Sequence, residues 1–407
     1  MMGEAWTNAS VAECLVPVAV SGKTKIQARD YKPSGRFPVI DQGQEQIAGW
    51  TDEDSAVIDA PLPLIVFGDH TRAFKFVDRP FARGADGTQL LRPKPGIDPL
   101  FFFYACRAID LPARGYNRHF TILKEKELAY PVDAHEQKTI AAVLRQTESA
   151  LAQQSGLLEA LEELKRSTMR ELFTRGLRGE PQKETEIGPV PESWEVVPLH
   201  SVAQVRGGTS FPPAFQGRNH GDLPFYKVSD MNLPGNEVDM CSAANWICRT
   251  DLEQLRARPF PPETIIFPKV GGALHTNKKR LLTGDSLVDN NIMGMTVRDR
   301  VNCLPKYLFG WFQTINLSSI ANAGPLPSIN ASQLYELKLP LPCLDEQREI
   351  VAILDAIDRK IDLHRKKRAV LEELFKALLH KLMTGELRVG DLGLSALEPQ
   401  RMAAATP

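Results

Sequence analysis

Residues 136–178 read EQKTIAAVLRQTESALAQQSGLLEALEELKRSTMRELFTRGLR, and residues 346–388 read EQREIVAILDAIDRKIDLHRKKRAVLEELFKALLHKLMTGELR. The two stretches align without gaps at a shift of 210 positions, with 13 identities in 43 positions and a shared LEEL motif. Average residue usage would give about three identities by chance. The chain of 407 residues therefore contains an internal repeat, with one copy of the repeated stretch in each half.

Both repeated stretches favour long helices. Neither contains proline, and apolar residues recur at the alternating 3-4 spacing that is typical of a coiled-coil seam. About 38 residues at 1.5 Å each give a helix of roughly 57 Å, which is long for a globular domain. Gly176 and Gly385 lie near the ends of the two stretches and are predicted helix stops. The predicted seam consists of Ile140, Leu144, Leu151, Leu161, Ile350, Leu354, Ile357, Ile361 and Leu371.

The sequence between the repeated stretches predicts globular blocks with short strands, bounded by Gly, Pro and Asp. The runs read as β-type are 37–40, 62–68, 74–77, 100–104, 194–205, 223–228, 264–267, 291–297 and 307–312. Residues 179–193 contain several prolines and glycines and predict an extended linker. The expected fold class is α+β, with two globular blocks in a pseudo-twofold repeat separated by two long antiparallel coiled-coil helices.

Composition restricts the function less than the repeat does. The net charge is −1, and residues 1–130 hold 16 basic and 16 acidic side chains, whereas residues 193–340 hold 14 and 12. Neither block is basic enough to indicate nucleic-acid binding by charge alone. The six scattered cysteines lack the spacing of a metal site, so we expect no metal and reduced thiols in the cytoplasm. No apolar run is long enough for a membrane span, and no signal peptide is expected.

Motifs of catalysis are not found. There is no glycine-rich nucleotide loop after a strand, and no Asp/Asn-Pro-Pro-aromatic motif of adenine methylation, so no catalytic residue is predicted. The acidic cluster of Asp133 and Glu136 imitates a nuclease site, but acidic residues at a helix start favour the helix dipole. We interpret it as a helix cap.

Several phrases, in a doubled order, resemble the specificity subunits of type I restriction–modification systems. They are Asp41-Gln42-Gly43 after residues 37–40, the runs 65–72, 84–91 and 226–230, Val190-Pro191 before Trp194, and Pro340-Leu341-Pro342 leading into Asp345-Glu346-Gln347. The resemblance covers roughly residues 8–388. It implies two target recognition domains, each reading one half of a bipartite, asymmetric DNA site, held apart by the helices.

The resemblance also sets the expected domains. These are residues 1–130 as target recognition domain 1, 131–178 as the central spacer helix, 179–193 as a linker, 194–340 as target recognition domain 2, 341–389 as the distal spacer helix and 390–407 as a flexible tail. The helices would hold the domains about one turn of DNA apart, ~34 Å or a multiple.

Polar residues in loop-like stretches are the candidate DNA contacts, because Arg and Lys read guanine while Asn and Gln read adenine. They are Gln42, Gln44, His70, Arg72, Arg118, Lys227, Lys269, His275, Asn277, Lys278, Lys279, Arg280 and Asn290. The 278–280 cluster is the favoured phosphate contact. Most single polar residues of this kind are ordinary surface groups, and that alternative stays open for each.

The resemblance implies partners as well as DNA. Two methyltransferase subunits would dock on the helices, and restriction subunits would bind further out. S-adenosylmethionine, ATP and Mg²⁺ would be used by those partners, with no cofactor held by this chain. Two alternatives remain: the specificity region of a single-chain restriction–methylation enzyme, and a coiled-coil scaffold that binds protein.

Overall fold

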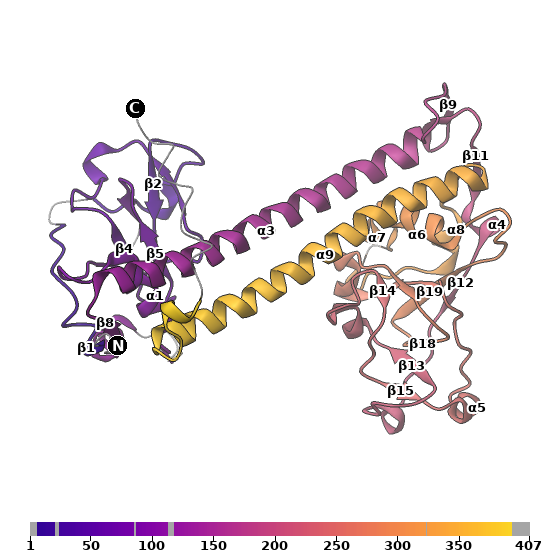
Figure 1. Cartoon of the computed structure of the whole chain (residues 1–407). Helices are drawn as coiled ribbons and strands as arrows, with labels where there is room; N and C mark the ends of the chain where they lie inside the picture. Colours follow the sequence, from indigo (N-terminus) through magenta and orange to yellow (C-terminus); the bar gives the residue numbers. More distant parts are fainter. Residues whose placement is uncertain (1–5, 21–23, 85–86, 113–117, 323, 393–407) are drawn as a thin grey trace. The chain divides into compact units, whose positions relative to one another are not determined.

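The computed structural model describes residues 6–20, 24–84, 87–112, 118–322 and 324–392. The chain forms two compact units. The first unit comprises residues 1–156 and 366–407, and the second unit comprises residues 157–365. Each long helix contributes to both units, because the boundaries fall inside α3 (Ala134–Arg175) and α9 (Leu344–Met383), the magenta and yellow helices of Figure 1.

The first unit contains small sheets and short helices beside the long ones. Strand orders are β3-β2-β6 and β5-β4-β7, with a separate β1-β8 pair. The strands are β1 (Trp6–Ser10), β2 (Phe37–Ile40), β3 (Gly49–Thr51), β4 (Leu64–Gly68), β5 (Phe74–Val77), β6 (Ala82–Arg83), β7 (Thr88–Leu91) and β8 (Glu127–Pro131). The helices are α1 (Pro99–Ala108) and α2 (Phe120–Glu125), with 3-10 turns η1 (Ala28–Asp30), η2 (Asp54–Ala56) and η7 (Val389–Leu392).

The second unit has the same plan with a larger sheet, of order β12-β19-β16-β17-β14. Its strands are β9 (Gln182–Thr185), β10 (Gly188–Pro191), β11 (Glu195–Pro198), β12 (Ala203–Gly207), β13 (Leu223–Tyr226), β14 (Asp239–Met240), β15 (Trp246–Ile247), β16 (Ile265–Pro268), β17 (Arg280–Leu282), β18 (Leu287–Val288), β19 (Ile292–Val297) and β20 (Lys338–Leu341). Its helices are α4 (Leu199–Val202), α5 (Leu252–Leu255), α6 (Pro305–Thr314), α7 (Leu317–Ile320) and α8 (Ala331–Tyr335). The 3-10 turns are η3 (Pro213–Phe215), η4 (Val228–Asn232), η5 (Arg249–Asp251) and η6 (Gly271–Thr276). The fold class is therefore α+β, as the sequence predicts.

Two predicted strands are wrong. Residues 100–104 lie in helix α1, and residues 307–312 lie in helix α6. Both helices are buried on most of their surface, so their sequences lack the polar face that usually reveals a helix. Each begins with a proline in its first turn, where the missing N–H removes no hydrogen bond. Residues 199–202 also interrupt the predicted run 194–205 as the short helix α4.

The long helices are confirmed; each begins two residues before its repeated stretch and ends before that stretch does. The two glycine stops are confirmed as well, since Gly176 and Gly385 have φ angles of 63° and 72°. Residues 179–193 are not an open linker, because β9 and β10 pair there as an antiparallel hairpin. Of the predicted tail, residues 390–392 belong to η7, and residues 393–407 lie outside the described residues.

A buried glutamine joins each long helix to its globular block in the same way. In the first unit, the Gln137 amide donates to Pro131 O at 2.8 Å and Gly96 O at 3.1 Å, and its oxygen accepts from Asp98 N at 2.7 Å. In the second unit, Gln347 donates to the carbonyl oxygens of Pro342 and Asn302, both at 2.9 Å, and accepts from Leu304 N at 2.9 Å. Both side chains are fully buried. The glutamines that align in the sequence repeat therefore make equivalent hydrogen bonds in the two units.

The glutamate that precedes each glutamine binds the segment that follows the other long helix, through a hydrogen bond or an ion pair. Glu346 at the start of α9 accepts from Leu177 N at 2.7 Å and from Trp194 Nε1 at 3.1 Å in the second unit. Glu136 at the start of α3 pairs with Arg388 at 3.5 Å in the first unit. The end of each helix is thus fastened to the beginning of its partner.

Within each unit, the segments of α3 and α9 run antiparallel. In the second unit, Lys165 pairs with Asp358 at 2.6 Å, and Glu162 pairs with Arg365 at 2.8 Å. The predicted seam residues Leu161, Ile357 and Ile361 pack together with Leu158. The other predicted seam residues join the cores of the two units, except Leu371, which is half-buried and outside them.

Among the described residues, no helix has the length and apolar character that crossing a membrane requires. The same residues hold no group of three His, Cys, Asp or Glu side chains arranged to bind a metal ion. Asp133 caps α3 as predicted, since its carboxylate accepts from His135 N at 3.0 Å and Glu136 N at 3.1 Å. These hydrogen bonds lower the pKa of Asp133.

Candidate nucleic-acid interface

The loop after β2 carries two predicted contact residues on a fixed turn. Asp41 accepts from Gly43 N at 2.8 Å and pairs with the buried ammonium of Lys75 at 3.4 Å. The Gln42 amide oxygen is buried, 2.5 Å from where a Cβ at Gly87 would lie. Gln44 is exposed at the rim of a cleft of about 930 Å³. Gln44 is therefore better placed to reach a ligand than the half-buried Gln42, which stays a candidate contact.

The turn between β4 and β5 holds His70 and Arg72. Arg72 has a φ angle of 63°, and its guanidinium donates to Leu111 O at 2.6 Å while it lines the same cleft as Gln44. Thr71 fastens this turn to the preceding one by a hydrogen bond to Gln42 O. Arg118 is exposed just outside the cleft lining. The cleft therefore unites two of the five first-block candidates.

In the second unit, Lys269 and Asn290 come together. They line a shallow cleft of about 450 Å³ with Asn291 and Asn330. Lys269 N donates to Asn291 O at 2.9 Å, which ties the loop after β16 to the loop before β19. Asn290 is exposed. An ammonium and exposed amides on one surface can donate to phosphate oxygens and pair with base edges.

Asn330 is not among the contacts predicted from the sequence. It caps a helix, since its side chain accepts from Gln333 N at 3.0 Å at the start of α8. Its place beside Lys269 comes from a contact between distant segments: Ile329 N donates to Lys269 O at 2.8 Å. No local pattern in the sequence carries that information.

Lys227 is held by its own domain. Its ammonium donates to Gln216 Oε1 at 2.8 Å and lies 5.2 Å from the Phe211 ring centroid. Phe211 in turn stacks on Phe225 at 3.7 Å. The lysine stands at the start of the η4 turn, where Lys227 N donates to Asp230 Oδ2 at 2.7 Å. The hydrogen bond to Gln216 occupies one of the three N–H donors of the Lys227 ammonium and leaves the other two for a phosphate.

The predicted 278–280 phosphate cluster is corrected by the structure. Lys279 is 3% exposed, and its ammonium donates to Ile315 O at 2.5 Å and Asn277 Oδ1 at 3.0 Å. Burial lowers the pKa of Lys279 to about 7. Arg280 donates to Lys279 O at 2.9 Å and Met231 O at 3.2 Å, and Lys278 bonds the Asn232 amide. The three side chains do not form one exposed cationic patch.

Asn277 is likewise structural. It has a φ angle of 50°, which asparagine tolerates better than most residues, and its amide oxygen also accepts from Leu317 N at 2.9 Å. His275 next to it is exposed, with Nδ1 3.1 Å from Ser318 Oγ. His275 therefore stays a candidate contact, whereas Asn277 shapes the loop that presents it.

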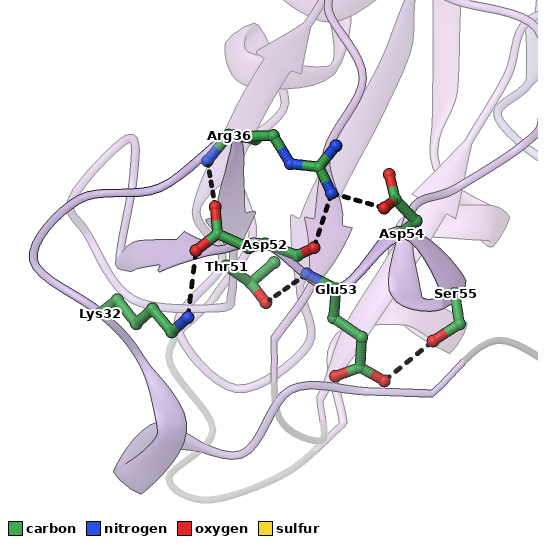
Figure 2. A network of polar contacts seen from close by, with 7 residues as sticks. All are labelled: Lys32, Arg36, Thr51, Asp52, Glu53, Asp54 and Ser55. Atoms are coloured by element: carbon green, nitrogen blue, oxygen red, sulfur yellow. Dashed lines mark hydrogen bonds and ion pairs between the residues drawn. The ribbon is translucent and has the colours of Figure 1, made fainter.

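Two further surface cations of the first unit, Lys32 and Arg36, are neutralised locally. Figure 2 shows Asp52 between Lys32 and Arg36, with the Lys32 ammonium at 3.0 Å and Arg36 N at 2.9 Å. The same arginine side chain donates to Asp52 O at 2.9 Å and pairs with Asp54. These contacts lower the pKa of Asp52, the hydrogen bond from Arg36 N most of all. This network stabilises the turn after β3 and leaves little net charge for DNA.

The long helices expose apolar side chains at matching places. Leu164 of α3 is 50% exposed in the second unit, and Leu374 of α9 is 45% exposed in the first unit. They are the last residues of the two LEEL motifs, so the repeat places one exposed leucine in each unit. Val370 adds a further exposed side chain one turn before Leu374.

The comparisons with known proteins agree with this architecture. Residues 191–373 match the family described as the type I restriction modification DNA specificity domain. A putative type I restriction enzyme MjaX specificity subunit of Methanocaldococcus jannaschii is 26% identical, over 74% of this chain and 71% of the relative. The EcoR124I/EcoR124II specificity subunit of Escherichia coli is 23% identical, over 83% of each chain.

A solved structure has the same fold. The S subunit of a type I restriction–modification system from M. genitalium superposes with a TM-score of 0.60, at 16% identity, covering 94% of this chain and 96% of that one. The matched domain, the curated relatives and the shared fold all lead to the same family. This chain is similar to the specificity subunits of type I restriction–modification systems.

Proposed function

We propose that this chain is a specificity subunit that selects a split, asymmetric DNA site, with each globular block reading one half. The observation that carries the proposal is the repeated anchor. Gln137 and Gln347 attach a long helix to each block by the same three hydrogen bonds, whereas the loops that expose polar groups differ between the blocks. The two globular blocks are attached to the long helices in the same way but expose different polar groups. Such an arrangement is what recognition of a DNA site with two unlike halves requires.

The proposed reading surfaces follow from the clefts. In the first unit, Gln44 and Arg72 line one cleft, and in the second unit, Lys269 and Asn290 line another. Glutamine and asparagine can pair with adenine, and arginine and lysine with guanine or phosphate. His70, Arg118, Lys227, His275 and Lys278 stay candidate contacts at the same blocks. Buried Lys279 is withdrawn as a DNA contact.

The proposed domains keep the predicted bounds, 1–130 and 194–340 for recognition and 131–178 and 341–389 for the helices.

We infer that two methyltransferase subunits dock on the helices, since Leu164 and Leu374 offer apolar contact at equivalent positions. Restriction subunits would join that complex. As a specificity subunit the chain is not the catalyst, so S-adenosylmethionine, ATP and Mg²⁺ would act in the partners, in the cytoplasm where the DNA is.

Methylome sequencing of the host, with the gene present and deleted, tests the proposal. The expected result is one split methylated motif that disappears on deletion and returns on complementation. An unchanged methylome with the methyltransferase partner still produced would contradict it.

A block exchange locates the reading surface. Replacing residues 10–130 by those of a relative should change one half of the motif and preserve the other. If the motif is unaltered, the first block does not read DNA.

A gel shift with the methyltransferase present tests the alternative of a protein-binding scaffold, which predicts no sequence-selective shift. Catalytic motifs in a continuous reading frame would indicate the other alternative, a single-chain restriction–methylation enzyme.

A further inference from the structure

The second unit contains a large basic cleft that the DNA-contact predictions do not explain. It has a volume of about 900 Å³ and lies between the end of α6, strand β17 and the second-unit segments of α3 and α9. Its lining includes seven basic and three acidic side chains. The whole chain has a net charge of −1, so this is a local excess of positive charge.

Four of the seven basic side chains are neutralised by ion pairs of 2.5 to 2.8 Å: Lys165–Asp358, Arg166–Glu163, Lys338–Glu186 and Arg365–Glu162. The other three are Arg170, Lys279 and Arg280. For these three, the described part of the chain provides no carboxylate within ion-pair distance. The positive excess of the cleft therefore comes from them.

Of these three cations, Lys279 is buried and Arg280 is half-buried. Lys279 bonds only neutral oxygens, those of Ile315 and Asn277, and packs 5.1 Å from the Phe312 ring centroid. Arg280 bonds two backbone carbonyls, and its Nε is buried with no hydrogen-bond partner among the described residues. Burial lowers the pKa of both side chains. Glu237 also lines the cleft and raises the pKa of Arg280, without forming an ion pair with it. Cations that are removed from water without an ion pair are costly, and a bound anion would lower that cost.

We propose that this cleft binds a phosphate group, with Arg280 and Arg170 as its ligands and Lys279 as a positive charge beneath it. Guanidinium groups bind phosphate through paired, charge-assisted hydrogen bonds, and phosphate carries enough charge to balance more than one cation. The phosphate comes from the DNA backbone or from a free phosphate compound. The first source rests on the proposed function, and the second does not.

The cleft belongs to the repeated architecture. Ile315 follows α6 and lines it, and Ile109 follows α1 and lines the 930 Å³ cleft of the first unit. In the first unit, however, four basic side chains face three acidic ones, and Arg107 is paired with Glu148 at 2.5 Å. The duplicated cleft has therefore kept its size, whereas the surplus of cations is found in the second unit.

Thermal unfolding of the full-length chain in inorganic phosphate, against sodium chloride of equal ionic strength, tests the site. We expect a saturable rise in Tm with phosphate, and Arg280→Met should weaken the apparent affinity roughly tenfold or more. Arg206→Met is the matched control. Arg206 is also a half-buried cation that bonds only carbonyls, of Arg258 at 2.9 Å and Pro259 at 2.7 Å, but it lies outside the cleft lining.

A second pair of variants guards against misfolding of Arg280→Met. Arg170 is exposed on α3, so Arg170→Gln should fold normally and still weaken phosphate binding. Arg175→Gln, on the same helix but outside the cleft lining, should leave phosphate binding unchanged.

The salt dependence of duplex DNA binding distinguishes the two phosphate sources. If the source is the DNA backbone, Arg280→Met or Arg170→Gln should reduce the slope of log K against log salt by about 0.9 for each phosphate that the variant no longer neutralises. A phosphate-dependent Tm rise with an unchanged DNA slope identifies a free phosphate compound, and this holds even if sequence-specific DNA binding is absent. No Tm rise together with equal DNA slopes for all variants would overturn the proposal.

Discussion

At the scale of single residues, the two buried glutamines are the clearest product of the duplication. Each provides both donors and its acceptor to backbone groups of the neighbouring block, so a helix cannot shift without breaking three hydrogen bonds. The sequence alignment identifies the pair, but periodicity alone assigns them only to a helix surface. Their function as anchors depends on carbonyls that are remote in sequence.

Gln347→Leu should destabilise the second unit by about 2–4 kcal/mol, because it leaves Leu304 N and two carbonyl oxygens buried without partners. Urea unfolding followed by fluorescence measures the change. Gln182→Leu is the control, since the exposed Gln182 makes one hydrogen bond, to Thr174 O, and its removal should cost less than about 0.5 kcal/mol. Equal effects of the two variants would show that Gln347 is not an anchor.

Lys279 should give the second unit a characteristic pH dependence. Its pKa is about 7 in the folded chain, against an ordinary value of 10.5, so between these pH values the unfolded chain binds more protons. The contribution of Lys279 to the free energy of unfolding is therefore lowest below pH 7 and rises as the pH increases toward 10.5. The gain is about 1.4 kcal/mol for each unit of pKa shift.

Lys279→Met should remove that slope. In phosphate-free buffer, the stability difference between wild type and variant should change in favour of wild type from pH 7 to pH 10. The variant also lacks the hydrogen bonds to Ile315 O and Asn277 Oδ1, which adds an offset at all pH values, so the slope is the informative quantity. Parallel stability curves would mean that Lys279 keeps its ordinary pKa.

At the scale of elements, the sequence predicts long periodic helices well and short buried ones poorly. The 3-4 spacing over 43 residues identifies α3 and α9, whose observed bounds lie within a few residues of the repeated stretches. Helix α1 is a run of apolar residues buried on nearly all sides, so its pattern cannot be distinguished from a buried strand. The informative signal is Asp98-Pro99, a helix cap followed by proline.

That cap can be tested directly. The Asp98 carboxylate accepts from Leu100 N at 3.0 Å and Phe101 N at 2.9 Å, so Asp98→Ala should destabilise the first unit by about 1 kcal/mol. Asp110→Ala, at an exposed position just after the same helix, should change stability by less than about 0.5 kcal/mol. Chemical unfolding of both variants decides whether the cap matters.

The exposed leucines of the long helices predict the partner interface. Leu164→Ser and Leu374→Ser should each weaken methyltransferase binding by roughly tenfold, since burying a leucine contributes about 1.5–3 kcal/mol. Val301→Ser is the control, because Val301 is also exposed but lies in a loop of the second unit. Surface plasmon resonance with the methyltransferase measures the affinities, and unchanged values would place docking elsewhere.

At the scale of the whole molecule, the duplication could be predicted and the candidate interface only in part. Repeat, fold class and helices follow from patterns local to the sequence. The reading surface depends on which loops meet, as when Lys269 joins Asn290 and Asn330, and on which cations are buried, as for Lys279. Those outcomes come from tertiary packing, which residue type and spacing do not specify.

The fastening of each helix end to the start of the other has a consequence for a chain that is cut. A protease that cleaves the hairpin tip at Ile187, which is 42% exposed, would leave two fragments with one long helix each. Within the first unit Glu136 would still hold Arg388, and within the second unit Glu346 would still hold Leu177. The nicked protein should therefore elute from a sizing column as one species and separate only in denaturant.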